Sequence, residues 1–100
     1  MRAEKVILLV REERDQWEGL RSTLGLGVEN LWVACCFINT EIKMKPDKEQ
    51  GFKENLEMLE ELEGEVYTNV PVNAERYKMK YLELKDLAKK LSEYDLVVPF

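Results

Sequence analysis

The sequence predicts a single α/β domain built on a parallel sheet. Apolar stretches of strand length alternate along the chain with amphipathic stretches of helix length, which is typical of parallel sheets joined by right-handed crossovers. The apolar stretches lack the polar alternation of a half-exposed strand, so each suits a strand that is covered on both faces. A chain of 100 residues has room for one core, so we interpret 1–100 as one domain.

Four strands are predicted from these apolar runs. They lie at 5–10 (KVILLV), 31–38 (LWVACCFI), 65–70 (EVYTNV) and 94–100 (YDLVVPF). The segment 39–48, which Pro46 interrupts, and the segment 71–80 are interpreted as connections. A fifth strand has room at 39–49 or at 72–79.

Three amphipathic helices are expected between the strands. Asp15 followed three residues later by Glu18 is a capping-box pattern, and it predicts the start of the first helix. Gly25 and Gly27 are expected to end that helix. Apolar residues at helical spacing place the second and third helices at 50–63 and 81–93. Gly64 is expected to close the second helix.

Composition and charge exclude several classes of function. The chain has 20 acidic and 15 basic residues and a net charge of −5, which argues against a dedicated DNA or RNA binder. It has no histidine, so the commonest general base and the commonest metal ligand are missing, and we expect no metal and no cofactor. The apolar run near the N-terminus is too short for a signal peptide or a membrane span, which predicts a cytoplasmic protein without membrane contact.

The two cysteines are adjacent, at Cys35 and Cys36, inside the second predicted strand. Side chains alternate across a strand, so these two thiols are expected to point to opposite faces of the sheet and cannot chelate one metal ion. A reactive thiol needs an exposed and electropositive setting, whereas free cysteine in a strand packs like a small hydrophobe. We therefore interpret both cysteines as structural.

Charge is distributed unevenly along the chain. The acidic stretch comprises Glu54, Glu57, Glu60, Glu61, Glu63 and Glu65, and the basic stretch comprises Arg76, Lys78, Lys80, Lys85, Lys89 and Lys90. The ordinary interpretation of the acidic stretch is a solvated helix exterior. A chain that is acidic in one segment and basic in another can also complement a second copy of itself, and this predicts self-association with an electrostatic component.

Four stretches occur in a familiar order: KVILLV, EGLRSTLGLGVENLWVACCFI, EVYTNVPVNAER and KDLAKKLSEYDLVVPF. Together they resemble the DsrE/DsrF-like family of small sulfur-relay proteins, which includes the Tus proteins of tRNA thiolation, and the resemblance covers nearly the whole chain. It implies a three-layer, flavodoxin-like fold, with a mostly parallel sheet of four or five strands and helices on both faces. It also implies ring-shaped trimers or hexamers.

In members that carry sulfur, the resemblance implies a persulfide-forming cysteine in the loop after the third strand. That loop corresponds here to 68–77, and it contains no cysteine. Asn69 stands about where the thiol is expected, with Pro71, Asn73 and Arg76 around it. An amide cannot form a persulfide, so these four residues form a candidate site loop without the family's catalytic group.

Three functions follow as hypotheses. The first is a non-catalytic DsrE-like subunit, which assembles with itself or with a cysteine-bearing homologue and helps to recruit a sulfur-carrier protein. The second is a sulfurtransferase that uses Cys35 or Cys36, which requires one thiol at the mouth of a pocket. The third is a flavodoxin-like module that binds a small molecule through the loop at 69–76.

Overall fold

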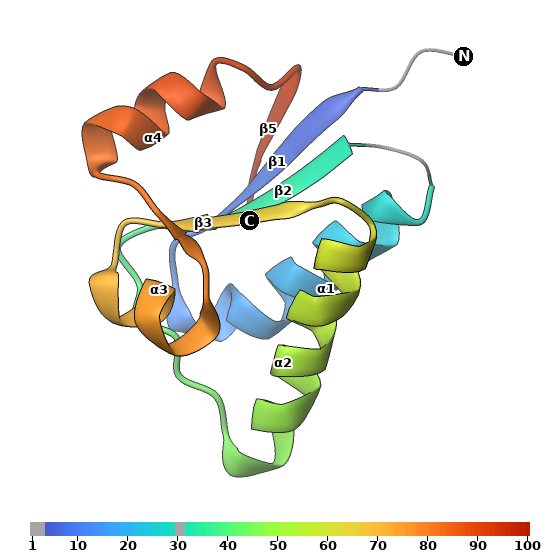
Figure 1. Ribbon diagram of the computed structural model, residues 1–100, viewed down its shortest axis with the longest axis vertical. Helices are drawn as coiled ribbons and strands as arrows, with labels where there is room; N and C mark the ends of the chain where they lie inside the picture. The colour runs from blue at the N-terminus through green and yellow to red at the C-terminus, as the bar shows by residue number, and fades with distance from the viewer. Residues whose placement is uncertain (1–3, 30–31) are drawn as a thin grey trace.

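The computed structural model describes residues 4–29 and 32–100, and these residues form one five-stranded sheet in which all strands are parallel (Figure 1). The strands are β1 (Lys5–Val10), β2 (Trp32–Phe37), β3 (Glu65–Thr68), β4 (Lys80–Tyr81) and β5 (Leu96–Pro99). Their order across the sheet is β4-β3-β2-β1-β5. The predicted α/β class is confirmed, and Leu31, the first residue of the second predicted strand, lies outside the described residues.

Helices lie on both faces of the sheet, which gives the three-layer, flavodoxin-like arrangement. They are α1 (Gln16–Gly27), α2 (Pro46–Glu61), α3 (Pro71–Tyr77) and α4 (Leu84–Leu91), with a short 3-10 turn η1 (Glu13–Asp15) before α1. The connections from β1 to β4 all advance in one direction, so right-handed crossovers place α1, α2 and α3 on one face, which we call the three-helix face. The last connection returns to the opposite edge of the sheet, so α4 lies alone on the other face, the α4 face (Figure 1).

Each face of the sheet has its own apolar core. On the three-helix face Phe37, Phe52 and Leu59 are fully buried, and on the α4 face Ile7 and Leu87 are buried together. The apolar strand stretches of the sequence predict that the sheet core contains Val6, Leu8, Val33, Val66 and Val97. Val6, Leu8 and Val33 are at most 6% exposed, whereas Val66 and Val97 are only partly buried. The last two lie on four-residue strands near the margins of the sheet, where fewer side chains cover them.

The limits of α1 differ from the prediction. The capping box is wrong, because the side chain of Asp15 caps no backbone group and the carboxylate of Glu18 accepts a hydrogen bond from Arg21 at 3.1 Å instead. Gly27 is the last residue of α1, as expected, but Gly25 lies inside the helix. Neither glycine has a positive φ, so neither provides a left-handed helix cap.

The segments interpreted as connections contain regular structure. Pro46 begins α2 and Pro71 begins α3, because proline suits the first turn of a helix, where its missing N–H leaves no bond unmade. The fifth strand, β4, follows directly after the predicted interval 72–79. At the end of α2 the left-handed residue is Glu63, with φ of 63°, and not Gly64. The predicted helix at 81–93 is shorter, at 84–91. No helix in the described part of the chain is long and apolar enough to cross a bilayer.

Replacing Gly19 or Gly25 of α1 with alanine is expected to change the free energy of unfolding in opposite directions. A Cβ at Gly19 would collide with the side chain of Val10, so Gly19→Ala should lower the free energy of unfolding by about 1–3 kcal/mol. A Cβ at Gly25 would meet no atom within 4 Å, so Gly25→Ala should raise it by about 0.5–1 kcal/mol through the helix propensity of alanine. Urea denaturation followed by circular dichroism measures both, and a shift of the same sign in the two variants would contradict this packing.

Candidate functional site

The candidate site lies at the carboxyl edge of the sheet, where open parallel sheets bind their ligands. Two connections meet there, the eight-residue loop 38–45 after β2 and the short link from β3 into α3. The loop 38–45 has no helix or strand of its own, and side chains from α1, from α3 and from the link between β3 and α3 hold its backbone.

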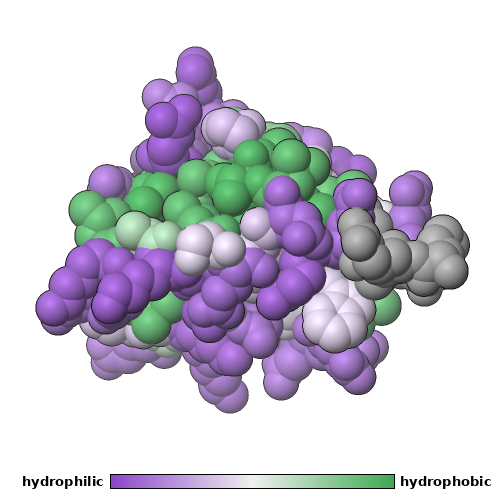
Figure 2. Space-filling model, turned by 90° about the horizontal axis from the view of Figure 1, so that it is seen from above, coloured by the Kyte–Doolittle hydropathy of each residue, from purple (hydrophilic) through white to green (hydrophobic). Residues whose placement is uncertain are grey.

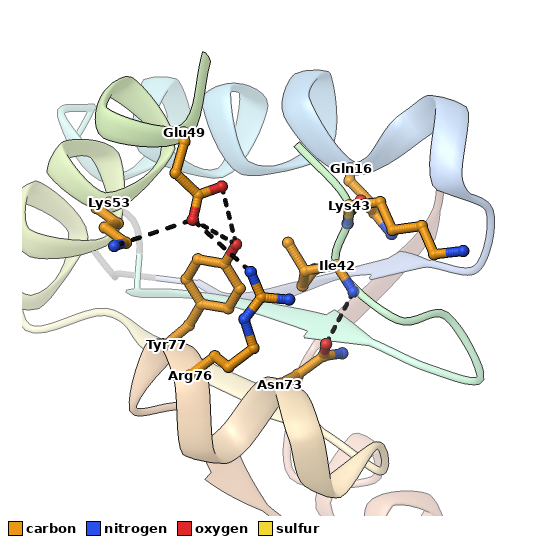
Figure 3. Close-up of polar contacts among 8 residues, drawn as sticks. All are labelled: Gln16, Ile42, Lys43, Glu49, Lys53, Asn73, Arg76 and Tyr77. Atoms are coloured by element: carbon orange, nitrogen blue, oxygen red, sulfur yellow. Dashed lines mark hydrogen bonds and ion pairs between the residues drawn. The ribbon is translucent and has the colours of Figure 1, made fainter. Parts of the chain in front are cut away.

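Asn73 holds this loop from α3 (Figure 3). Its side chain is 1% exposed, and its Oδ1 accepts a hydrogen bond from the backbone N–H of Ile42 at 2.8 Å. Its Nδ2 donates to the carbonyl oxygen of Thr40 at 2.8 Å and to Oγ1 of Thr68 at 3.1 Å. Both N–H groups of the Asn73 amide are thus used within the protein, two of its three hydrogen bonds go to the loop, and its burial keeps it from a ligand.

Gln16 holds the same loop from the first turn of α1, and sequence reasoning missed it. Its fully buried side chain donates from Nε2 to Oγ1 of Thr40 at 2.9 Å and to the carbonyl oxygen of Glu41 at 2.8 Å. Its Oε1 accepts from the backbone N–H of Lys43 at 3.0 Å. The sequence carries little signal for this role, because Gln16 lies within the polar stretch REERDQ and its partners are 24 or more residues away.

Asn69 follows the last residue of β3, at the position where the family resemblance places a thiol. It forms a reciprocal pair with Asn39, in which Asn69 Oδ1 accepts from the Asn39 backbone N–H at 2.7 Å and Asn69 Nδ2 donates to Asn39 Oδ1 at 2.8 Å. Asn39 has a φ of 56°, a left-handed conformation that asparagine tolerates well. Asn69 is only partly buried, so this pair lies where solvent reaches it.

The four residues predicted for the site do not converge on one pocket. Asn69 and Asn73 bind the loop 38–45, and Pro71 is an exposed first residue of α3. Arg76 lies in the last turn of α3, where its guanidinium packs over the ring of Tyr77 and lies 3.9 Å from an oxygen of Glu49. In the structure, therefore, Asn69 and Asn73 both bind the loop 38–45, whereas Arg76 lies in the contact between α3 and α2.

That contact is centred on Tyr77. Its hydroxyl donates to the carboxylate of Glu49, with the two oxygens at 2.9 and 3.1 Å (Figure 3). Its ring packs edge-on against Phe52, with ring centroids 5.4 Å apart, and Phe52 packs in the same manner on Phe37. Burial, followed by the neighbouring Glu49, raises the pKa of Tyr77 to about 12. The tyrosine is thus a neutral donor that ties α3 to α2 and to the core.

Cys35 and Cys36 are both fully buried, and they belong to different cores. Cys35 packs in the core of the three-helix face and Cys36 in the core of the α4 face, as alternation along the strand predicted. Burial raises the pKa of both thiols to about 12. Each thiol therefore stays protonated at neutral pH and has no access to a reagent in solution.

These raised pKa values predict a loss of stability at alkaline pH. The folded protein holds the thiol protons up to about pH 12, whereas the unfolded chain releases them near pH 9.0. The contribution of the two thiols to the free energy of unfolding should therefore be fully present well below pH 9 and be lost as the pH rises from 9 to 12, by up to about 1.4 kcal/mol per pH unit for each thiol. Reversible urea denaturation between pH 7 and pH 11 measures this slope.

A double variant with Cys35→Ala and Cys36→Ala is the control for this slope. It should be less stable at pH 7 but should lose less stability between pH 9 and pH 10. Tyr77 and Tyr94, whose pKa values burial also raises to about 12, account for the remaining decline above pH 10. An equal slope in the double variant would contradict the assignment to the thiols.

The fold and the site define a parallel α/β domain. At the carboxyl edge of its sheet, the side-chain amides of Gln16, Asn69 and Asn73 hold the loop 38–45 by hydrogen bonds. Within residues 4–29 and 32–100 no three His, Cys, Asp or Glu side chains are grouped so as to hold a metal ion. Comparisons of the chain with protein-family models, with curated proteins and with solved structures found no match.

Proposed function

We propose that this chain is a non-catalytic, DsrE-like subunit of a cytoplasmic sulfur relay. It assembles with itself or with a cysteine-bearing homologue, and it helps to recruit a sulfur-carrier protein. The sulfur relay, the ring-shaped oligomer and the carrier are what the family resemblance implies. The observation that carries the non-catalytic role is the burial of the chain's thiols, both of which are fully buried in the cores on the two faces of the sheet.

Sulfur transfer through a protein cysteine begins with a thiolate that can reach its donor. With a pKa of about 12, only roughly three in 100,000 molecules of Cys35 or Cys36 would be ionised at pH 7.5. At the end of β3, where the family places the thiol, Asn69 is engaged with Asn39. These facts favour the partner role over a sulfurtransferase that uses Cys35 or Cys36.

The α4 face supports a role in assembly. A single eight-residue helix covers this face, and apolar side chains around its core remain partly exposed. They are Leu9, Ile38, Leu82, Leu91, Tyr94 and Val97. Figure 2 looks onto this face and shows apolar surface gathered between charged margins. Contiguous apolar surface of this kind marks interaction sites on soluble proteins, and we propose it as the face that a second subunit covers.

Light scattering of the pure protein tests the assembly. Val97 and Val98 are neighbours on the edge strand β5, both partly buried, and they point to opposite faces of the sheet. Val97→Lys should lower the oligomer mass, whereas the control Val98→Lys should leave the mass unchanged. Circular dichroism melts confirm that both variants fold. A wild-type protein that is strictly monomeric at 100 μM on its own and when mixed with a cysteine-bearing homologue would overturn the proposal.

Persulfide uptake tests the non-catalytic role. The native protein is incubated with a polysulfide donor under reducing-agent-free conditions, and its mass is then measured. No added sulfur is expected on Cys35 or Cys36 in the folded state. Stoichiometric addition of 32 Da, roughly one sulfur atom per chain, to either cysteine of the folded protein would show that the chain is itself a sulfur carrier.

A further inference from the structure

A groove of about 720 Å³ lies on the three-helix face, between α2 on one side and α3 with β4 on the other. It exists because these elements differ in length. Helix α2 has 16 residues, whereas α3 has 7 and β4 has 2. Because β4 pairs with β3 only at Tyr67 and Thr68, the first half of β3 has no strand beside it at this edge. The volume lies in the range of ligand-binding pockets.

The two walls of the groove carry opposite charges. One wall, formed by α2 and the start of β3, presents Glu57, Glu60, Glu63 and Glu65, with a single lysine, Lys53, among them. The carboxylate of Glu65 also accepts a hydrogen bond from the hydroxyl of Tyr67. The other wall, formed by the end of α3 and by β4, presents Arg76, Lys78 and Lys80. Between the walls the lining is apolar, with Leu56, Val66 and the ring of Tyr77. The acidic and basic stretches of the sequence thus face each other within one chain.

The charges on the walls are only weakly paired with each other. The Nζ of Lys80 lies 3.4 Å from an oxygen of Glu65, and Arg76 reaches Glu49 only at 3.9 Å. These side chains are at least 31% exposed, and such pairs contribute little to stability. Among the described residues no ion pair within 4 Å involves Glu57, Glu60, Glu63 or Lys78. A ligand therefore has charges of both signs to engage without breaking a strong internal pair.

One end of the groove is bounded by a fixed contact. There Tyr77 donates its hydrogen bond to Glu49, and Lys53 and Arg76 both approach the same carboxylate (Figure 3). Since Glu49 lies in the first turns of α2, this contact holds the two walls together near the carboxyl edge of the sheet. Towards the other end of the groove lie Glu60 and Glu63, and among the described residues no ion pair within 4 Å engages either of them.

We propose that this groove binds a short peptide that has a cationic end, an apolar centre and an anionic end. A ligand of one sign is attracted by one wall and repelled by the other, whereas a bipolar ligand is attracted by both. Each wall carries three or more charges, which is more than a single amino acid can match. The apolar lining between the walls is suited to aliphatic side chains in the middle of the peptide. This site is distinct from the α4 face, and it does not depend on a role in sulfur transfer.

Three tetrapeptides of equal length test the ligand class. The bipolar probe is Lys-Leu-Leu-Glu with free termini, the anionic probe is acetylated Glu-Leu-Leu-Glu, and the cationic probe is amidated Lys-Leu-Leu-Lys. Each is titrated into the ¹⁵N-labelled protein. The bipolar probe is expected to shift the backbone amides of Gly64, Val66 and Lys78, and to bind at least tenfold more tightly than the other two. Equal affinities for the three probes, or no shift at these amides at 5 mM peptide, would overturn the proposal.

A charge swap on one wall makes the test specific to the groove. Glu57→Lys with Glu60→Lys removes the excess negative charge of the α2 wall, because Glu63 and Glu65 then lie beside Lys53 and the two new lysines. Binding of Lys-Leu-Leu-Glu should therefore weaken at least tenfold, and acetylated Glu-Leu-Leu-Glu should become the preferred probe. The matched control is Glu54→Lys with Glu61→Lys, which makes the same change on the same helix outside the groove. The control should keep the wild-type preference. The same switch in both double variants would show a net-charge effect and would reject the groove as the site.

Discussion

An Asn69→Cys variant is expected to react with a thiol reagent at pH 7.5 about a thousandfold faster, or more, than Cys35 and Cys36 of the native protein. An ordinary cysteine has a pKa near 8.5, so about one molecule in ten is a thiolate at this pH. At a pKa of about 12 the fraction is roughly three in 100,000. The thiolate fractions alone differ by a factor of about 3,000, and position 69 is also partly exposed whereas the native cysteines are buried.

The thiol at position 69 should have an ordinary pKa. Arg76 lies in the last turn of α3, whereas Asn69 precedes the first, so the guanidinium is not placed to stabilise a thiolate there. Asn69→Ser is the control, because it removes the same hydrogen bonds to Asn39 without adding a thiol. The native cysteines of Asn69→Ser should remain slow. Labelling of Asn69→Cys at the native rate, or fast labelling of the Asn69→Ser control, would contradict the placement of this residue.

If the carboxyl edge has the architecture of a sulfur relay, the same variant should also accept sulfur. Asn69→Cys incubated with a polysulfide donor is expected to gain one sulfur atom at position 69, while the native protein gains none. Mass spectrometry of the tryptic peptide that contains position 69 identifies the modified residue. A fast-labelling thiol that never acquires sulfur would confirm the fold and reject the relay.

The long elements of the fold could be predicted from the sequence because each carries its own signal. The strand at Lys5–Val10 agrees with the prediction residue for residue, since the five consecutive apolar residues from Val6 to Val10 suit a strand that is covered on both faces. The short helix α3 was not predicted, and the fifth strand, for which 39–49 and 72–79 had room, lies at Lys80–Tyr81 as β4. A helix of seven residues is not stable by itself, and α3 depends on distant contacts such as that of Tyr77 with Glu49. No local pattern encodes such a contact.

The position of Asn69 was predicted only through the family resemblance, which places it in the loop after the third strand. The apolar pattern alone extended that strand to Val70, whereas β3 ends at Thr68 and Asn69 directly follows it. Its partner, Asn39, is 30 residues away, and Gln16 meets the loop 38–45 across 24 or more residues. Whether a polar side chain faces a ligand or a neighbouring loop depends on such pairings. The groove likewise depends on how separate elements meet, because its two charged walls face each other beyond the end of α3 and beside the first half of β3, before β4 begins.

Asn73→Leu is expected to cause the largest loss of stability among the polar substitutions, about 2–6 kcal/mol. The leucine has a similar size, but it leaves the N–H of Ile42 and the carbonyl oxygen of Thr40 without their partner, in a region where both bonds are buried. Each buried polar group without a partner costs about 1–3 kcal/mol. This loss is a large fraction of the 5–15 kcal/mol that holds a typical domain folded.

Asn69→Ala provides the comparison that separates burial from hydrogen bonding as the cause. It also removes two hydrogen bonds to the loop, but the pair with Asn39 is exposed, so water can replace the lost partner and the expected loss is about 1 kcal/mol or less. Urea denaturation measures both losses, and hydrogen exchange at Ile42 locates the effect. In Asn73→Leu the amide of Ile42 should exchange faster than the amides of β2, because its acceptor is gone. Equal stability losses in the two variants, or an unchanged exchange rate at Ile42, would show that Asn73 does not hold the loop 38–45 in place.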